Sequence, residues 1–407
     1  MDKVIAWWGK GIFISLCASM ILLGAGPIEW SVPGAGIRAW SVSRTTFFMW
    51  LIWRLLIWFR SGSPQLGFLR HNIPIPLVLF FIAVTISLVP NFHRIGDYRY
   101  FFFGSMHYLM ILDFCSDQKR WRLIYHLLAL LPVLLAVRGI LYDPLVLELD
   151  QMRRFGYPLP HPNIAGYLFA MTLPLCLAIA VGERGIMRVL SLLSGGGQLL
   201  ALILTYSRGS WFGWWASIFS FGVMLKRWRE IWVILTMVAL FLALATPLQE
   251  RLFSLVSPQT DFSINERLKA MEDGLQLGLE HPVLGVGYGR AQLRSGLREQ
   301  HRNAATEYTH IAHTHNMYVE LFAQTGLLGL GAFLWLLYHA LSTALRTAGR
   351  PDNASRVSQL GIVAAWIAFA VTGLGDVPFY HHEIRILFFT LLALTDTLPA
   401  VLNVPRN

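Results

Sequence analysis

Residues 247–316 read PLQERLFSLVSPQTDFSINERLKAMEDGLQLGLEHPVLGVGYGRAQLRSGLREQHRNAATEYTHIAHTHN. This polar stretch lies between two hydrophobic runs, each long enough to cross a bilayer. It is rich in arginine and histidine, and it ends with His315 and Asn316 directly before the next apolar run. We therefore expect a chain that folds within a membrane and carries one large polar cap. The cationic and imidazole side chains of the cap predict a site for an anionic substrate attached to a lipid.

The composition is typical of a helical membrane protein. Of 407 residues, 55% are hydrophobic and 14% are charged, and the apolar residues come in blocks. These blocks are about twenty residues long and lack the alternation of strands, so they predict helices rather than a barrel. The net charge of +10 is scattered over short loops, which indicates contacts with membrane lipids and phosphate groups and no nucleic acid. The three cysteines have no spacing typical of a disulfide framework or a metal site.

The apolar segments predict an all-α integral membrane protein with about twelve transmembrane helices and one large loop that contains short helices. Residues 1–246 would carry helices one to nine, residues 247–315 the loop, and residues 316–407 helices ten to twelve, in a single membrane domain. The segments are centred on residues 11–26, 45–59, 73–89, 98–114, 123–141, 164–181, 189–206, 211–225, 231–245, 317–341, 360–374 and 384–401.

Basic residues in the short loops predict the orientation. With a cytoplasmic N-terminus, the inside loops hold about twice as many lysines and arginines as the outside loops, as the positive-inside rule requires. Twelve spans then place both termini in the cytoplasm and the long loop outside. The outside arginines, among them Arg153, Arg154 and Arg208, need a reason other than orientation.

Within the long loop, Ser263-Ile-Asn-Glu266 has the pattern of a capping box and predicts a helix that runs to about Leu279. Arg267 flanks the apolar stripe of this helix, which we expect to lie on the membrane or on the helix bundle. His281-Pro282 would end the helix. The stripe consists of Ile264, Leu268, Met271 and Leu275, and the glycines that follow, Gly285, Gly287 and Gly289, allow close backbone approach.

Three motifs together resemble the O-antigen ligase and polymerase superfamily. Tyr206-Ser-Arg-Gly209 links two spans, and Arg267 lies in a helix followed by His281-Pro-Val-Leu-Gly-Val-Gly-Tyr-Gly289. His315-Asn316 precedes Gly326-Leu-Leu-Gly329, where the glycines would let another helix pack closely. The motifs occur on the same predicted face, and the likeness extends to the layout of twelve spans with one large outside loop.

The resemblance implies a GT-C-like glycosyltransferase of the bacterial inner membrane that takes a glycan from undecaprenyl diphosphate at the periplasmic face. In the ligase branch the acceptor is a lipid A-core sugar, and the reaction is inverting and uses neither nucleotide nor metal. Arg208 and Arg267 match the essential arginines of the family, His315 matches its essential histidine, and Asp376 matches an acid of the last outside loop.

The chemistry of these residue types fits such a reaction. Guanidinium groups stabilise the charge that grows on a departing diphosphate, and an imidazole can take the proton of the attacking hydroxyl. Simpler interpretations stay open: an interfacial arginine can bind lipid phosphates, and a histidine can cap a helix. The predicted catalytic residues are His315, Arg208 and Arg267, and the predicted substrate-binding residues are Arg208, Arg267, Arg290, Asn316, Asp376 and His161.

Two further clusters are open to more than one interpretation. His310, His313 and His315 could hold a metal, but no carboxylate with ligand spacing lies beside them, so we expect no metal site. Arginines at positions 290, 294, 298 and 302 share a helical face, which indicates a solvated or headgroup-binding stripe, with a phosphate-rich acceptor as the alternative.

Other functions compete with the ligase. An O-antigen polymerase and a protein O-oligosaccharyltransferase belong to the same superfamily, and the short segment after the last span favours the ligase over the protein-glycosylating branch. A flippase or transporter of polyprenyl-linked glycans would show two related halves and ionisable residues near the bilayer midplane. The sequence has no obvious repeat and, within the spans, only Arg54 and Arg138 stand out.

Overall fold

A computed structural model describes residues 2–26, 28–29, 36–62, 73–89, 95–115, 117–147, 153–227, 229, 232, 236, 262–300, 313–349 and 353–402. The helices are α1 (Asp2–Ala25), α2 (Ala39–Ser61), α3 (Ile75–Ser87), α4 (Gly96–Phe114), α5 (Gln118–Leu130), α6 (Pro132–Tyr142), α7 (Pro162–Gly182), α8 (Ile186–Leu204), α9 (Arg208–Met224), α12 (Phe262–Glu280), α13 (Arg290–Gln300), α14 (Met317–Ala348), α15 (Asn353–Thr372) and α16 (His382–Leu402). Short 3-10 helices cover Pro144–Leu147 and Pro378–Tyr380, and two-residue strands, β1 (Ile28–Glu29) and β2 (Gly36–Ile37), pair antiparallel.

The predicted apolar segments coincide with these helices, except that residues 231–245 lie almost wholly outside the described part of the chain. The segment 123–141 is divided between α5 and α6 at Pro132, a residue that lacks the backbone N–H needed to continue a helix. The described helices with the length and composition to cross a membrane are Val4–Ala25, Gln118–Tyr142, Pro162–Gly182, Ile186–Leu204 and Met317–Ala348. The fold is thus that of an all-α multi-pass membrane protein, and the count of twelve spans stays a prediction.

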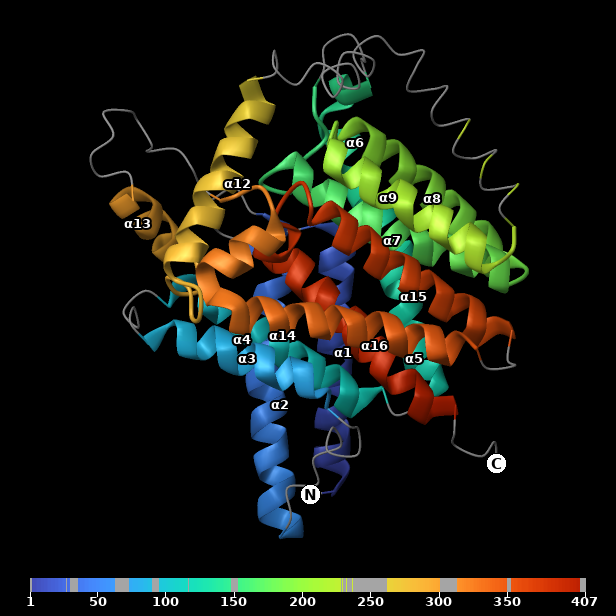
Figure 1. The fold of residues 1–407 in the computed structure, drawn as a ribbon. Helices are drawn as coiled ribbons and strands as arrows, with labels where there is room; N and C mark the ends of the chain where they lie inside the picture. Colours follow the sequence, from blue (N-terminus) through green and yellow to red (C-terminus); the bar gives the residue numbers. More distant parts are fainter. Residues whose placement is uncertain are drawn as a thin grey trace.

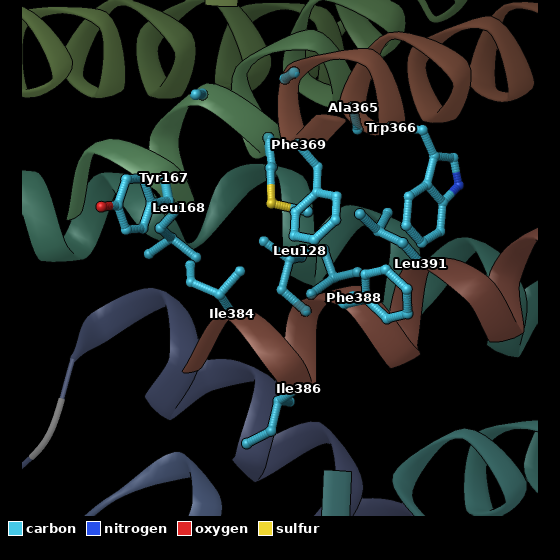
Figure 2. Packing of buried hydrophobic residues seen from close by; sticks show 14 of the residues in the cluster. Leu128, Tyr167, Leu168, Ala365, Trp366, Phe369, Ile384, Ile386, Phe388 and Leu391 are labelled. Carbon is cyan, nitrogen blue, oxygen red and sulfur yellow. The ribbon is translucent and has the colours of Figure 1, made fainter. Parts of the chain in front are cut away.

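Helix α7 lies at the centre of the bundle. Of the most apolar 18-residue stretch of α7, 89% is buried inside the protein, against 22% of the corresponding stretch of α1. It packs against α8, α9 and α15, and the four helices lie together in Figure 1. Figure 2 shows how Tyr167 of α7 shares one core with side chains of α5, α15 and α16, among them Leu128, Phe369 and Phe388. The start of α7 is therefore held in a fixed position.

Helix α12 packs on α14 through small residues. A methyl group at Gly274 would lie 3.2 Å from Val319 of α14, and one at Gly278 would lie 2.4 Å from Phe322, so the two helices approach closely. Leu268 and Leu275 of the predicted apolar stripe point away from this contact, 52% and 45% exposed, whereas the sulfur of Met271 accepts from the side-chain amide of Asn316 (3.7 Å). Of the two expected surfaces, membrane or bundle, the exposure of Leu268 and Leu275 favours the membrane, because apolar side chains of a membrane protein can face lipid.

The loop at residues 281–289 fastens the cap to α14. The N–H of Val286 donates to the carbonyl of Ala323 (2.9 Å), and the N–H of Leu327 donates to that of Pro282 (2.8 Å). Gly326 breaks α14 between these bonds, with φ 64° and ψ −166°, a conformation that is essentially restricted to glycine. We expected a helix to pack on Gly326 and Gly329, but at Gly326 the partner is this loop, and an added methyl group at Gly329 would meet Thr325 of α14 itself.

Candidate active site

The turn at residues 373–376, which follows α15, is where several predicted site residues meet. The guanidinium of Arg267, on α12, donates to the carbonyl of Gly375 (3.3 Å). The side-chain amide of Asn316 donates to the carbonyl of Leu374 (3.0 Å), and the N–H of Met317 donates to that of Gly373 (2.8 Å). The polar cap and the start of α14 therefore converge on one short turn.

His315 stands immediately before α14 in an unusual backbone conformation. Its φ is +55°, in the left-handed region, which costs a residue other than glycine about 1–3 kcal/mol. Asn316 caps the helix, since its Oδ1 accepts from the N–H groups of Tyr318 (3.0 Å) and Val319 (3.1 Å). The second strained position in this region is Tyr206, with φ +51°, two residues before Arg208. Strain of this kind is typical of functional sites.

The carboxylate of Asp376 lies beside two imidazoles. Its Oδ1 is 3.4 Å from Nε2 of His313 and 3.7 Å from Nδ1 of His315. Asp376 itself is only 4% exposed. Burial opposes the charged form, yet hydrogen bonding by His313, the neighbouring His315 and the charge of His313 hold the pKa of Asp376 well below its ordinary value. The site thus contains a carboxylate that stays negative.

The two imidazoles differ in their affinity for a proton. Burial lowers the pKa of His313, but the hydrogen bond to Asp376 together with the charges of Glu320 and Asp376 outweighs burial and raises the pKa overall. Burial lowers the pKa of His315, and the charges of His313 and Arg267 lower it further against the attraction of Asp376. The side chain of His315 is 27% exposed, so a neutral imidazole faces accessible space. Such a group can accept a proton from a substrate.

The side chain of Asp376 is also hydrogen-bonded to the start of α7. The amide nitrogen of Asn163 donates to Oδ2 of Asp376 (2.7 Å), and both side chains are buried. His161 is the N-cap of α7, because its Nδ1 accepts from the N–H of Asn163 (3.2 Å), and its contact with substrate stays a prediction. Burial and then the charge of Arg154 lower the pKa of His161. The N-cap of α7 is therefore His161 and not Asn163, although asparagine is the more usual capping residue.

Arg208 is the first residue of α9, and its side chain is half-buried. The next residue, Gly209, faces the end of α15, where an added methyl group would lie 3.9 Å from the carbonyl oxygen of Thr372. Since the turn at 373–376 begins directly after Thr372, the backbone that carries Arg208 borders the turn on which Arg267 converges.

Arg290 lies apart from this cluster. Its backbone N–H donates to Oδ2 of Asp97 (2.8 Å), and its guanidinium lies over the ring of Tyr380, 4.4 Å from the centroid. Asp97, Arg290 and Arg294 line a separate cavity of about 360 Å³. Arg294 and Arg298 are exposed on the same face of α13, as the fourfold spacing predicted, and Arg302 lies outside the described residues.

Within the described part of the chain, one group of side chains could hold a metal ion. Donor atoms of His313, His315 and Asp376 all lie within 4.8 Å of one another. The sequence argument against a metal relied on the lack of a nearby carboxylate, and that argument is wrong, because the fold brings Asp376 to the two histidines. His310, the third histidine of the proposed cluster, lies outside the described residues.

The fold and the site together define a multi-pass membrane protein whose polar cap brings an arginine, two imidazoles and an acid to one turn. Residues 167–334 match the family model described as O-antigen ligase. This match supports membership of the chain in the O-antigen ligase and polymerase superfamily, which is a family of enzymes. It confirms the resemblance that the motifs indicated. The matched range includes Arg208, Arg267 and His315, whereas Asp376 lies beyond it. None of the curated proteins matches the chain.

Proposed function

We propose that this protein is an O-antigen ligase. It transfers a glycan from undecaprenyl diphosphate to a sugar of lipid A-core at the periplasmic face of the bacterial inner membrane. The observation that carries the proposal is the meeting of Arg267, His315 and Asp376 at the turn that follows α15, beside the turn of Arg208.

In the proposed reaction, an acceptor hydroxyl attacks the anomeric carbon from the face opposite the phosphate. The new bond joins the acceptor oxygen to this carbon as the bond to the phosphate oxygen breaks, and its electron pair leaves with undecaprenyl diphosphate. His315 takes the hydroxyl proton, which agrees with the pKa of His315 lying below its ordinary value. A base of this kind contributes about a hundredfold to ten-thousandfold in rate.

Arg208 and Arg267 would stabilise the leaving diphosphate. Their charge counts more in the transition state than in the ground state, since the phosphate oxygens become more negative as the bond breaks. The guanidinium fork matches phosphate oxygens in pairs, which an ammonium group does not. Neither a nucleotide nor a metal takes part in the proposed reaction.

Reconstitution tests the proposal. The purified protein in nanodiscs is given undecaprenyl-diphosphate-linked glycan and lipid A-core, without nucleotide or divalent ion, and glycan transfer is measured. Transfer is expected for the wild type and should fall about a hundredfold or more in Arg208→Ala, Arg267→Ala and His315→Ala. Arg346→Ala is the matched control, because this arginine is exposed near the far end of α14 and, among the described residues, bonds to Ser342 of its own helix.

The acceptor decides between the related functions. Transfer only to a second carrier-linked glycan would identify a polymerase, and transfer only to serine or threonine of a peptide would identify a protein O-oligosaccharyltransferase. Movement of the carrier-linked glycan across the bilayer without cleavage of the glycan would identify a transporter and overturn the proposal.

A further inference from the structure

Two hydrogen bonds connect Asp376, through Asn163, to Arg154, a residue that the proposed reaction does not use. Arg154 lies half-buried in the segment that precedes α7. Its NH2 group donates to Oδ1 of Asn163 (2.6 Å), and the amide nitrogen of Asn163 donates in turn to Oδ2 of Asp376 (2.7 Å). A fixed cation is thus connected to the Asp376 carboxylate through one buried amide.

The orientation of that amide follows from the hydrogen-bonding capacity of its neighbours. A guanidinium can only donate, and an ionised carboxylate can only accept. Asn163 must therefore turn its oxygen to Arg154 and its nitrogen to Asp376, and the opposite orientation would lose both bonds. Because Asn163 is only 7% exposed, water does not readily replace either partner.

The carboxylate is held from both sides in this arrangement. Oδ2 of Asp376 accepts from Asn163, and Oδ1 accepts from the N–H of Val377 (3.0 Å) while facing His313 and His315. Its direction towards the imidazoles is set by these bonds.

Arg154 also reaches the turn that carries Arg208. Its Nε donates to the carbonyl of Thr205 (2.9 Å), and the N–H of the next residue, Phe155, donates to the carbonyl of Leu204 (2.8 Å). One side chain therefore contacts both the support of Asp376 and the backbone just before Arg208.

We propose that Arg154 is a positioning residue of this site: it orients the amide of Asn163 so that Asn163 holds the Asp376 carboxylate against the two imidazoles. This role rests on the proposed glycosyl transfer. Neither residue touches the substrate in this proposal, and both act through Asp376 on His315.

The first test compares neighbouring arginines. Arg154→Ala is expected to lower kcat about a hundredfold, as a misplacement of about 1 Å does, with KM for the carrier-linked glycan changed less than about threefold. The matched control is Arg153→Ala, since Arg153 makes an exposed ion pair with Asp143 (2.8 Å) and should leave both constants unchanged. Asn163→Asp is a second variant of almost equal size, and it should lower kcat similarly because it places a carboxylate against Asp376.

A merely structural role of Arg154 would give a different pattern in a double-mutant cycle. If Arg154 acts through Asp376, then adding Arg154→Ala to the D376N protein should lower kcat by less than about twofold. An equal loss in the wild-type and D376N backgrounds would overturn the proposal.

A structural comparison separates this inference from the proposed function. Electron cryomicroscopy of the wild type and of Arg154→Ala in nanodiscs, each with a bound antibody fragment, should show the Asp376 carboxylate turned away from His313 in the variant. An unmoved carboxylate would overturn the positioning role even if transfer occurs. A wild type that transfers no glycan, combined with a moved carboxylate, would reject the proposed function alone.

Discussion

Oδ1 of Asp376 lies 3.4 Å from Nε2 of His313, closer than the 3.7 Å that separates it from Nδ1 of His315. The two neighbouring imidazoles therefore differ in how closely they interact with the carboxylate. His313 is the better partner of the carboxylate, and its pKa is raised, whereas the pKa of His315 is lowered by burial and by the charges around it. His315 is therefore neutral at pH 7 and ready to accept a proton.

Replacing His313 by glutamine should shift the acid limb of the pH profile of kcat/KM to higher pH. The charge of His313 lowers the pKa of His315, and in its absence Asp376 attracts the His315 proton more strongly. The base works only when neutral, so a raised pKa means that activity is lost at a higher pH than in the wild type. Transfer rates from about pH 5 to 8 would measure the shift.

The control for this profile is His339→Gln. His339 lies on another part of α14 and pairs with Asp396 of α16 (3.0 Å). Its replacement should therefore leave the pH of the acid limb unchanged. A limb at the same pH in H313Q and the wild type would contradict the division of roles between the two imidazoles.

Zinc should inhibit transfer by occupying the base. His313, His315 and Asp376 offer two imidazoles and a carboxylate, a ligand set that zinc accepts, and a bound ion would take the lone pair that His315 needs. We expect micromolar zinc to lower the transfer rate, a chelator to restore it, and H313Q to be less sensitive. If a chelator alone abolishes transfer and zinc restores it, the metal-independent reaction is wrong.

The helices could be predicted from the sequence because apolar blocks of membrane length end at polar residues. The orientation of α12 could not be predicted in the same way. Hydrophobicity marks Leu268 and Leu275 as a packing face, but α14 contacts Gly274 and Gly278, which carry no hydrophobic signal. In a bilayer, small residues let helices approach while large apolar residues can face lipid.

The candidate site could be predicted only in part. Arg267 and His315 stood out through their motifs, and the structure brings them to one turn. The roles of Arg154 and Asn163 left no comparable signal, because they depend on contacts between residues far apart in the chain. Asparagine near a helix start is typical of a cap, whereas the amide of Asn163 bonds to both Arg154 and Asp376.

Asn316→Ala should cost stability and activity together. The Asn316 side chain accepts from two N–H groups of α14 and donates to the carbonyl of Leu374, and losing such a cap costs about 1 kcal/mol. Asn316→Asp keeps the acceptor of the cap but not the donor, so it should retain most of the stability and still lower kcat. Thermal unfolding in detergent and transfer rates would separate the two effects. Equal unfolding temperatures for the alanine variant and the wild type would contradict the capping role.

Gly326→Ala should loosen the polar cap from the bundle. The backbone of Gly326 has φ 64°, and a methyl group there would lie 2.2 Å from the carbonyl of Val283, so α14 and the loop at 281–289 cannot keep their contact. Backbone strain alone costs about 1–3 kcal/mol, and the displacement of α12 would move Arg267 away from Gly375. We expect a lower unfolding temperature and a reduced transfer rate. Gly331→Ala, in the same helix with open space around it, should be neutral or slightly stabilising, since alanine favours a helix over glycine. Equal effects of the two substitutions would mean that the loop does not fix the cap to α14.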